Sequence, residues 1–293
     1  MRSLLSRRRP DEPLILPGAP DALAARVIEA LGFEAVYITG AGVTNARLGM
    51  PDLALITLTE LADAVEAVRE AVAIPIVVDA DTGFGGPFNV RRTVQTLERR
   101  GANAIQLEDQ RSPKRCGHFA GKEVIPADEM VAKLHAALDV RQDDSLLIVA
   151  RTDARQMEGL SAALERAERY RAAGADVIFV EAPESTDELA EIGRRIDAPL
   201  LVNVVEGGAT PQLPAAELGA LGFSIVLYAN AALRGAVHGM QTVLGHLRQT
   251  GSTLGVLDHM LGWEERQKLV GKPFFDELSE RYATPKQEEV PYE

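Results

Sequence analysis

Residues 75–110, PIVVDADTGFGGPFNVRRTVQTLERRGANAIQLEDQ, hold two short apolar runs separated by a longer, more polar segment. The runs Ile76–Asp79 and Ala104–Glu108 are almost continuously apolar, as is typical of strands covered on both faces in a parallel sheet. Gly101 precedes the second run, in the position of a glycine that ends a helix. The stretch therefore predicts a strand, a helix and a second strand parallel to the first.

The same unit repeats along the chain. The other expected strands are Leu14–Leu16, Ala35–Thr39, Leu146–Arg151, Val177–Glu181, Leu200–Asn203 and Ser224–Leu227. Helical patterns lie between them, for example Leu160–Ala173, which Gly174 ends. Eight such units over about 250 residues predict a (β/α)₈ barrel of the TIM type. A doubly wound open sheet is the alternative, but the first strand is not followed by a G-x-G-x-x-G turn.

We expect two parts in the chain. Residues 1–250 should form the catalytic barrel, and residues 251–293 should form a C-terminal helical extension that packs on the barrel or on a partner subunit. The pattern of Trp263–Tyr282 is helical, with a break near Gly271-Lys272-Pro273. The N-terminus, MRSLLSRRRP, is basic but lacks the apolar segment of a secretory signal, so we expect a frayed end.

Composition excludes several classes of protein. The 293 residues are 46% hydrophobic and 25% charged, as in ordinary globular proteins. A net charge of −12 argues against a nucleic-acid or anionic membrane partner. No apolar run approaches the roughly 20 residues of a membrane span. The single cysteine, Cys116, excludes an intrachain disulfide, which suits a cytoplasmic protein.

Polar residues end most of the expected strands. Charged or amide groups end five strands in succession: Asp79, Glu108, Arg151, Glu181 and Asn203. In a barrel these positions share one rim, where active sites form. Because buried charges cost several kcal/mol unless they are paired or bind a cation, the pattern predicts one site for a metal and an anionic ligand.

The metal-binding candidates are carboxylates. Asp79 and Asp81 are two residues apart, so they share a face of an extended backbone, and Glu108 and Asp109 add further oxygens. Carboxylate ligands without His or Cys partners favour Mg²⁺, or Mn²⁺, over Zn²⁺. An Asx turn would explain the two aspartates if they stood alone, but their acidic neighbours favour the metal.

Two further segments could contact a substrate. Tyr37 and the turn Gly40-Ala41-Gly42 offer a phenol and backbone N–H groups to a carboxylate, although a tight turn that requires glycine explains the same residues. Residues 108–122 form a long polar stretch of the kind that becomes a lid. Within it, cationic neighbours of Cys116 should lower the pKa of its thiol and activate it.

Together these motifs resemble the isocitrate lyase/phosphoenolpyruvate mutase superfamily, from about Leu14 to Gly251. The shared motifs are LGMPD (48–52), DADTGFG (79–85), EDQ (108–110), KRCGH (114–118), ARTDA (150–154) and EGGATP (206–211). The resemblance implies a modified barrel whose last helix is swapped between subunits, in a homotetramer built from dimers.

The resemblance also implies roles for individual residues. Asp79 and Asp81 would hold Mg²⁺, directly or through water, with Asp52 and Glu108 behind them. Cys116 would be the general acid, and Tyr37 would face the enolate oxygen. Arg151, Glu181 and His118 complete the implied catalytic set. Substrate contacts are implied for Thr39, Gly40, Ala41, Gly117, Arg151, Glu181, Asn203 and Arg234.

The cysteine-containing loop is similar to that of the carbon–carbon lyases of the superfamily. The implied activity is Mg²⁺-dependent cleavage of a 2-hydroxy dicarboxylate, such as 2,3-dimethylmalate or 2-methylisocitrate, to pyruvate and a carboxylic acid. Trp263 stands where a methylisocitrate lyase would carry an arginine, which favours a smaller acid. The alternatives are phosphorus–carbon chemistry of the carboxyvinyl-carboxyphosphonate phosphorylmutase type, oxaloacetate hydrolysis or decarboxylation, and non-catalytic binding of small acids.

Overall fold

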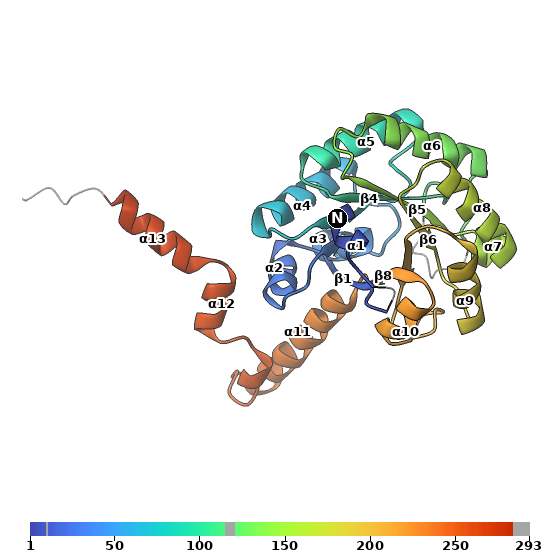
Figure 1. Ribbon diagram of the computed structural model, residues 1–293. Coiled ribbons are helices and arrows are strands. Elements are labelled where there is room, and N and C mark those ends of the chain that lie inside the picture. Colours follow the sequence, from blue (N-terminus) through green and yellow to red (C-terminus); the bar gives the residue numbers. More distant parts are fainter. Residues whose placement is uncertain (10, 115–120, 284–293) are drawn as a thin grey trace, which may run out of the picture. The chain divides into compact units, whose positions relative to one another are not determined.

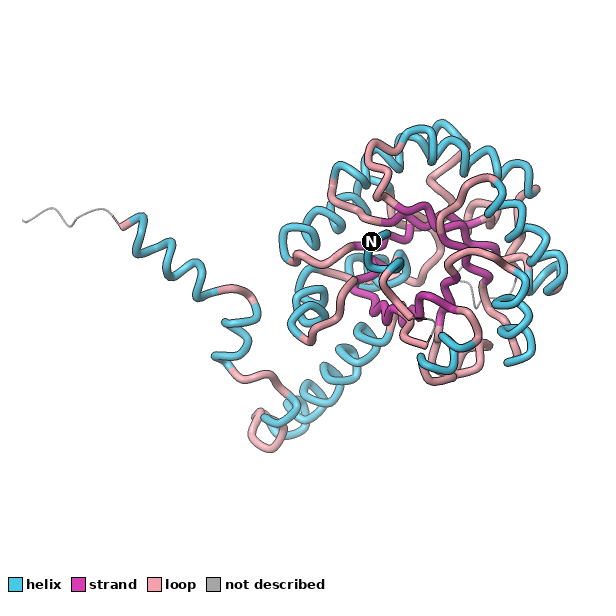
Figure 2. The backbone as a smooth tube through the Cα atoms, in the orientation of Figure 1, coloured by secondary structure: helices cyan, strands magenta, loops and turns pink. Residues whose placement is uncertain are grey.

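The computed structural model describes residues 1–9, 11–114 and 121–283. Within these residues eight parallel strands form a closed barrel in chain order, and β8 pairs with β1. The strands are β1 (Leu14–Ala19), β2 (Val36–Ile38), β3 (Ile76–Asp79), β4 (Ala104–Glu108), β5 (Leu147–Thr152), β6 (Val177–Val180), β7 (Leu200–Asn203) and β8 (Phe223–Tyr228). Figure 2 shows the strands as an inner ring with helices outside it. The predicted barrel is confirmed, with strand ends shifted by at most a few residues.

Helices cover the outside of the barrel (Figure 1). They are α2 (Ala22–Ala30), α3 (Gly40–Leu48), α4 (Leu58–Ala71), α5 (Pro87–Arg99), α6 (Ala127–Val140), α7 (Arg155–Glu158), α8 (Leu160–Ala172), α9 (Thr186–Arg195) and α10 (Ala215–Ala220). Local sequence sets their ends. The side chain of Thr57 caps the backbone N–H of Glu60, and the Glu60 carboxylate accepts from the N–H of Thr57, so α4 begins with a capping box.

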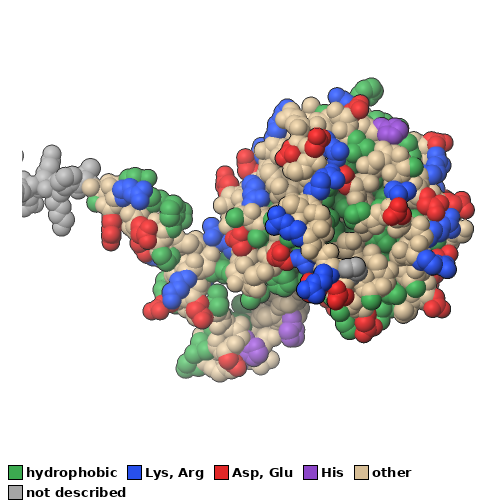
Figure 3. Space-filling model, viewed as in Figure 1, with side chains coloured by type: hydrophobic (Ala, Val, Ile, Leu, Met, Phe, Trp, Pro, Cys, Tyr) green, Lys and Arg blue, Asp and Glu red, His purple; other side chains and the backbone are tan. Residues whose placement is uncertain are grey.

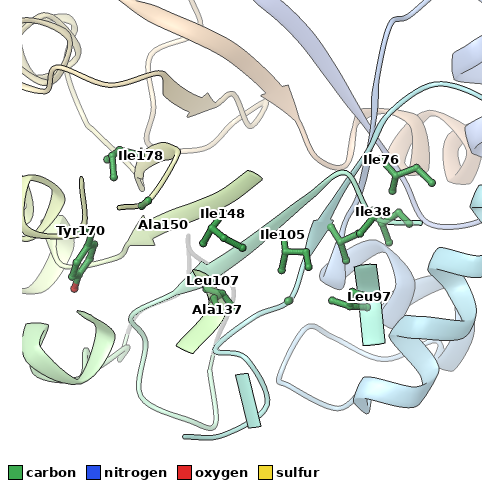
Figure 4. Packing of buried hydrophobic residues seen from close by; sticks show 14 of the residues in the cluster. Ile38, Ile76, Leu97, Ile105, Leu107, Ala137, Ile148, Ala150, Tyr170 and Ile178 are labelled. Atoms are coloured by element: carbon green, nitrogen blue, oxygen red, sulfur yellow. The ribbon is translucent and has the colours of Figure 1, made fainter. Parts of the chain in front are cut away.

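The apolar residues form two buried layers. The outer layer lies between strands and helices and includes Ile38, Ile105 and Leu97 (Figure 4). The inner layer fills the barrel with alternate strand residues such as Leu16 and Phe179. Because successive strand residues point to opposite faces, each strand contributes to both layers, which explains why the strands read as continuous apolar runs.

The N-terminus is not frayed, so that prediction was wrong. Residues Arg2–Ser6 form α1, and Leu4 and Leu5 pack against the inner layer of the barrel. The Arg2 guanidinium lies 2.6 Å from Asp176 Oδ1, while Arg141 lies 2.9 Å from the other oxygen of the same carboxylate. The apolar pair Leu4-Leu5 between the basic residues anchors this segment on the barrel.

The chain divides into two compact units, Met1–Val237 and His238–Glu293. Helix α11 (Ala231–Thr250) crosses that boundary, and a short 3₁₀ turn (Leu257–His259), α12 (Trp263–Leu269) and α13 (Lys272–Tyr282) follow it. The predicted helix pair with a break at Gly271 is confirmed, since Gly271 has a φ of 78°. Several large apolar side chains of the second unit are exposed, among them Leu261, Trp263 and Phe274.

None of the helices in the described ranges combines the length and apolar character that crossing a bilayer requires. Acidic and basic side chains are interspersed over the barrel on the face shown in Figure 3.

Candidate active site

The polar residues that end the strands lie together at the carboxyl end of the barrel. Strand pairing places Glu108 beside Arg151, and Arg151 in turn beside Phe179. Glu108, Arg151 and Glu181 are all buried, with exposed fractions of 2%, 7% and 2%. The rim expected from the sequence therefore exists as one buried cluster of charges.

Arg151 is the cation at the centre of this cluster. Its Nε and NH2 groups donate to the two oxygens of Asp153 at 2.9 and 3.0 Å. The same guanidinium lies 3.5 Å from Glu108 Oε2 and 3.6 Å from Glu181 Oε1, and it stacks over the Phe179 ring at 5.1 Å. Burial alone lowers the pKa of Arg151, but these carboxylates raise it well above its usual range.

The Asp153 carboxylate accepts hydrogen bonds from two further side chains besides Arg151. Its Oδ1 atom also accepts from Lys122 Nζ at 3.0 Å and from Gln110 Nε2 at 3.1 Å. Both side chains of the Lys122–Asp153 pair are fully buried. Burial raises the pKa of Asp153, yet Arg151 and Lys122 bring it below its usual range, so the carboxylate is ionised. This network fixes one edge of the Arg151 guanidinium.

Asp79 and Asp81 converge on one point. Asp79 ends β3, and Asp81 adopts a left-handed backbone with a φ of 49°. A Cβ atom built on Gly40 would lie 3.1 Å from Asp81 Oδ1 and 3.4 Å from Asp79 Oδ2. The start of α3 and both carboxylates therefore share one space, which a side chain at position 40 would crowd.

Lys114 neutralises part of this acidic group. Its Nζ lies 2.6 and 2.8 Å from the two oxygens of Asp52 and 2.8 Å from Asp81 Oδ1. Burial alone lowers the pKa of Lys114, but Asp81 and the neighbouring carboxylates raise it well above its usual range. Asp52 therefore contacts a lysine, a partner that the sequence did not indicate.

The acidic group fits a divalent cation. Burial raises the pKa of Asp81 to about 7, although Lys114 opposes the shift. Burial also raises the pKa of Glu108 well above its usual range, and Glu108 Oε1 has no hydrogen-bond partner among the described residues. Bound Mg²⁺ would offset this excess negative charge. In the described ranges, no three acidic, His or Cys side chains stand close enough together to ligate an ion by themselves.

Tyr37 is buried within the barrel and linked to the carboxylates. Its hydroxyl donates to Gln106 Oε1 at 3.1 Å, and Gln106 Nε2 donates to Asp79 Oδ1 at 3.2 Å. Burial raises the pKa of the Tyr37 phenol well above its usual range, and Asp79 adds to the shift, so the phenol is neutral.

The glycine-rich segment after β2 begins a helix, which corrects the expectation of a tight turn. Thr39 is the N-cap of α3, and its Oγ1 accepts from Gly42 N at 3.3 Å. The first backbone N–H groups of a helix have no partner within the helix, so those of Gly40 and Ala41 are available to an anion.

Two of the implied substrate contacts lie in different settings. Asn203 ends β7 and is buried, and its Oδ1 atom has no hydrogen-bond partner in the described part of the chain. Arg234 is more than half exposed and pairs with Glu206 at 2.9 Å. Asn203 therefore resembles a site residue in its burial, whereas Arg234 is held by a surface carboxylate.

Asp109 is not part of the acidic group, which corrects its inclusion among the oxygen ligands. Its carboxylate accepts from Thr152 Oγ1 and Tyr170 Oη, both at 2.7 Å, and from the backbone N–H of Asp153 at 2.9 Å. Adjacent residues of an extended chain point to opposite sides, so Asp109 faces α8 where Glu108 faces the barrel axis. Its role is structural.

Cys116, Gly117 and His118 lie outside the described residues. The structure therefore bears on the cysteine loop only through Lys114 before it and Lys122 after it.

Sequence comparison agrees with this geometry. The family model described as phosphoenolpyruvate phosphomutase matches residues 3–248. The chain belongs to this family.

Two curated relatives of this family member are lyases. The chain is 45% identical over 284 residues to 2,3-dimethylmalate lyase of Eubacterium barkeri, covering 97% of both chains. It is 44% identical over 271 residues to 2-methylisocitrate lyase of Aeropyrum pernix, covering 92% of this chain and 86% of the relative. A crystal structure of 2,3-dimethylmalate lyase superposes with a TM-score of 0.90 at 34% identity, covering 99% and 97% of the two chains.

Some polar contacts of this family member were missed in the sequence. The sequence places Gln106 within an apolar strand and Lys122 within a polar loop, without indicating a partner for either residue. The signal for Gln106 was an amide within a run that is otherwise buried and apolar. Lys122 offered no signal, because its partner Asp153 is 31 residues away and only the fold brings the two together.

Proposed function

We propose that the protein is a Mg²⁺-dependent carbon–carbon lyase that cleaves a 2-hydroxy dicarboxylate to a 2-oxo acid and a carboxylate. The observation that carries the proposal is the burial of Arg151 beside Glu108 and Glu181, next to the paired carboxylates Asp79 and Asp81. Such a site can bind a dianion and a divalent cation together. The relatives with lyase names support the same assignment.

Asp79 and Asp81 would hold the metal, with Asp52 and Glu108 beside them. Bound Mg²⁺ would supply Lewis acidity and stabilise the negative charge that develops on the substrate oxygens. The N–H groups of Gly40 and Ala41 are available for the carboxylate of the 2-oxo acid portion. The edge of Arg151 that Asp153 does not occupy and the Asn203 amide are available for the remaining oxygens.

The chemical step is a retro-aldol-type cleavage. Glu181, whose Oε1 lies 3.6 Å from Arg151 and which is not assigned to the metal, would accept the proton of the substrate hydroxyl. As the hydroxyl carbon becomes a carbonyl, the bond to its neighbour breaks and the electron pair stays on the departing carbon. Cys116 donates the proton to that carbon, an assignment that comes from the KRCGH motif.

A substrate panel tests this proposal. Purified protein with Mg²⁺ is given 2,3-dimethylmalate, 2-methylisocitrate and oxaloacetate, with 2-oxo-acid release followed by coupled reduction and acetate and oxalate followed by chromatography. A phosphonate substrate is followed by ³¹P NMR. We expect 2-oxo-acid release from at least one 2-hydroxy dicarboxylate and none without divalent metal. Turnover of only the phosphonate or only oxaloacetate would contradict the lyase assignment.

The role of Cys116 has its own test. The variant Cys116→Ala should lose at least about a thousandfold in kcat, because the carbanion loses its proton donor, while it still binds Mg²⁺. Turnover near that of the unmodified enzyme would refute the assignment.

We also propose that the described part of the second unit, residues 238–283, packs on a second copy of the chain in a homotetramer. Large apolar side chains of this unit, such as Leu261, Phe274 and Phe275, are exposed, and contiguous apolar patches usually mark interfaces. Light scattering should give four times the monomer mass, and a monomer at micromolar concentration would contradict the proposal.

A further inference from the structure

Gln106 is a fully buried amide in the middle of β4, and the mechanism above does not use it. It lies on the same face of the strand as Ala104, which belongs to the inner layer of the barrel, and as Glu108. A buried amide costs free energy unless its polar atoms are paired. The buried amide is therefore stabilised by its two hydrogen-bond partners, Tyr37 and Asp79, and both are candidate site residues.

The two hydrogen bonds of Gln106 determine which way its amide faces. In the structure Oε1 accepts from the Tyr37 hydroxyl at 3.1 Å and Nε2 donates to Asp79 Oδ1 at 3.2 Å. Asp79 Oδ1 also accepts from the backbone N–H of Asp81 at 3.2 Å, so the reversed amide would place one hydrogen-bond acceptor against another. The Asp79 carboxylate thus selects one amide orientation.

That orientation fixes the hydroxyl of Tyr37. A phenol has one proton to donate, and Gln106 Oε1 receives it. The lone pairs of the Tyr37 oxygen remain for another donor. If Tyr37 faces the substrate, as the family resemblance implies, it would therefore present its oxygen atom and not its proton.

We propose that Gln106 is a positioning residue, which orients Asp79 for the divalent metal and turns the Tyr37 oxygen toward the substrate as a hydrogen-bond acceptor. The second part rests on the proposed function, since the hydroxyl of a bound 2-hydroxy acid would donate a hydrogen bond to the Tyr37 oxygen before its proton passes to the base. The first part does not depend on the reaction.

The first arm of the test measures metal binding without turnover. Free Mn²⁺ is counted by electron paramagnetic resonance in titrations of the full-length protein. Gln106→Met should raise the Mn²⁺ Kd about 10- to 100-fold, the usual effect of losing a partner of a metal ligand, whereas Tyr37→Phe should change it less than about 3-fold. An unchanged Kd in Gln106→Met would overturn the role toward Asp79.

The second arm measures whether the Tyr37 oxygen accepts a hydrogen bond from the hydroxyl of a ligand. Affinities for malate and for succinate, which lacks the hydroxyl, are compared in the Mn²⁺-loaded protein. Tyr37→Phe should lower the malate-to-succinate preference about 5- to 10-fold, Gln106→Met should lower it similarly, and the double variant should lower it no further. Multiplying losses in the double variant, or an unchanged preference in Tyr37→Phe, would overturn the role toward Tyr37.

A matched control separates positioning from folding. Asn103 Oδ1 accepts from Ile76 N at 2.9 Å and joins the same two strands at their opposite end. Asn103→Leu should lower the melting temperature but leave Mn²⁺ affinity and the ligand preference unchanged. If Gln106→Met does not fold, Gln106→Leu replaces it. If the substrate panel shows no lyase activity but both arms give the expected results, the lyase proposal is refuted and the positioning role of Gln106 is still supported.

Discussion

Replacing Asp153 by Asn should destabilise the protein more than any ordinary surface change, because two buried cations share this carboxylate. Asp153 accepts from Arg151 at 2.9 and 3.0 Å and from Lys122 at 3.0 Å, and its side chain is fully buried. Arg151 keeps Glu108 and Glu181 at 3.5 and 3.6 Å in the variant, but the fully buried ion pair between Lys122 and Asp153 is lost. Removing one partner of a buried ion pair costs about 3–5 kcal/mol.

The assay is thermal unfolding of the metal-free protein at pH 7. A loss of this size corresponds to a fall of about 6–15 °C in Tm for a chain of this length. Asp128→Asn, which breaks an exposed pair with Arg169, is the control and should leave the Tm unchanged. A fall of less than about 2 °C in Asp153→Asn would refute the reasoning that this carboxylate holds the two cations.

The pH dependence gives a second check on the same variant. The pKa of Asp153 is lowered in the folded protein, so its stabilising contribution is present above the unfolded value near 4 and is lost as the pH falls through the folded value. The difference in Tm between the unmodified protein and Asp153→Asn should therefore have its full size at pH 7 and become smaller only below about pH 4. A difference that narrows between pH 7 and pH 5 would assign the effect to another group.

Three further predictions concern the metal site and its support. The pKa of Asp81 is about 7 in the folded protein and near 4 in the unfolded chain, so its contribution to stability is full below pH 4 and is lost as the pH rises through 7. Calorimetry of the metal-free protein should therefore show a steeper fall in Tm between pH 5 and pH 8 for the unmodified protein than for Asp81→Asn. Equal slopes for the two proteins would contradict this prediction. Gly40→Ala should fold but bind Mg²⁺ at least about 10-fold more weakly by calorimetry, since the added methyl would lie 3.1 Å from Asp81 Oδ1; equal affinity would show that the carboxylates do not converge there. Tyr170→Phe, which removes the 2.7 Å hydrogen bond to Asp109, should cost about 1.5–3 kcal/mol in chemical denaturation with kcat unchanged, and a loss of activity without a loss of stability would contradict a purely structural role.

Most of the fold was predictable because it depends on local patterns. Buried strands such as Ile76–Asp79 read as apolar runs, and Gly101 and Gly174 end helices with φ values of 93° and 102°. The barrel rule then places the strand ends at one rim without further information. The N-terminal helix was missed because its stabilising contacts are with the barrel interior rather than within the helix.

The site was predictable to the level of residue types but not of pairings. A sequence shows that Glu108 and Arg151 end adjacent strands, and register alone makes them neighbours. It does not show that Asp109 turns outward to Tyr170, or that Lys114 reaches Asp52 across 62 residues. The partners of such side chains depend on which groups the folded loops bring within reach, and no local sequence pattern shows this.

The N-terminal helix α1 packs against the end of the barrel at which the strands begin. Leu4 and Leu5 pack against the inner layer of residues, and Arg2 and Arg141 share the Asp176 carboxylate beside them. Side chains fill the barrel interior, and α1 extends this apolar packing beyond the strands. Substitutions in α1 should therefore change the stability of the barrel without direct contact with the rim carboxylates.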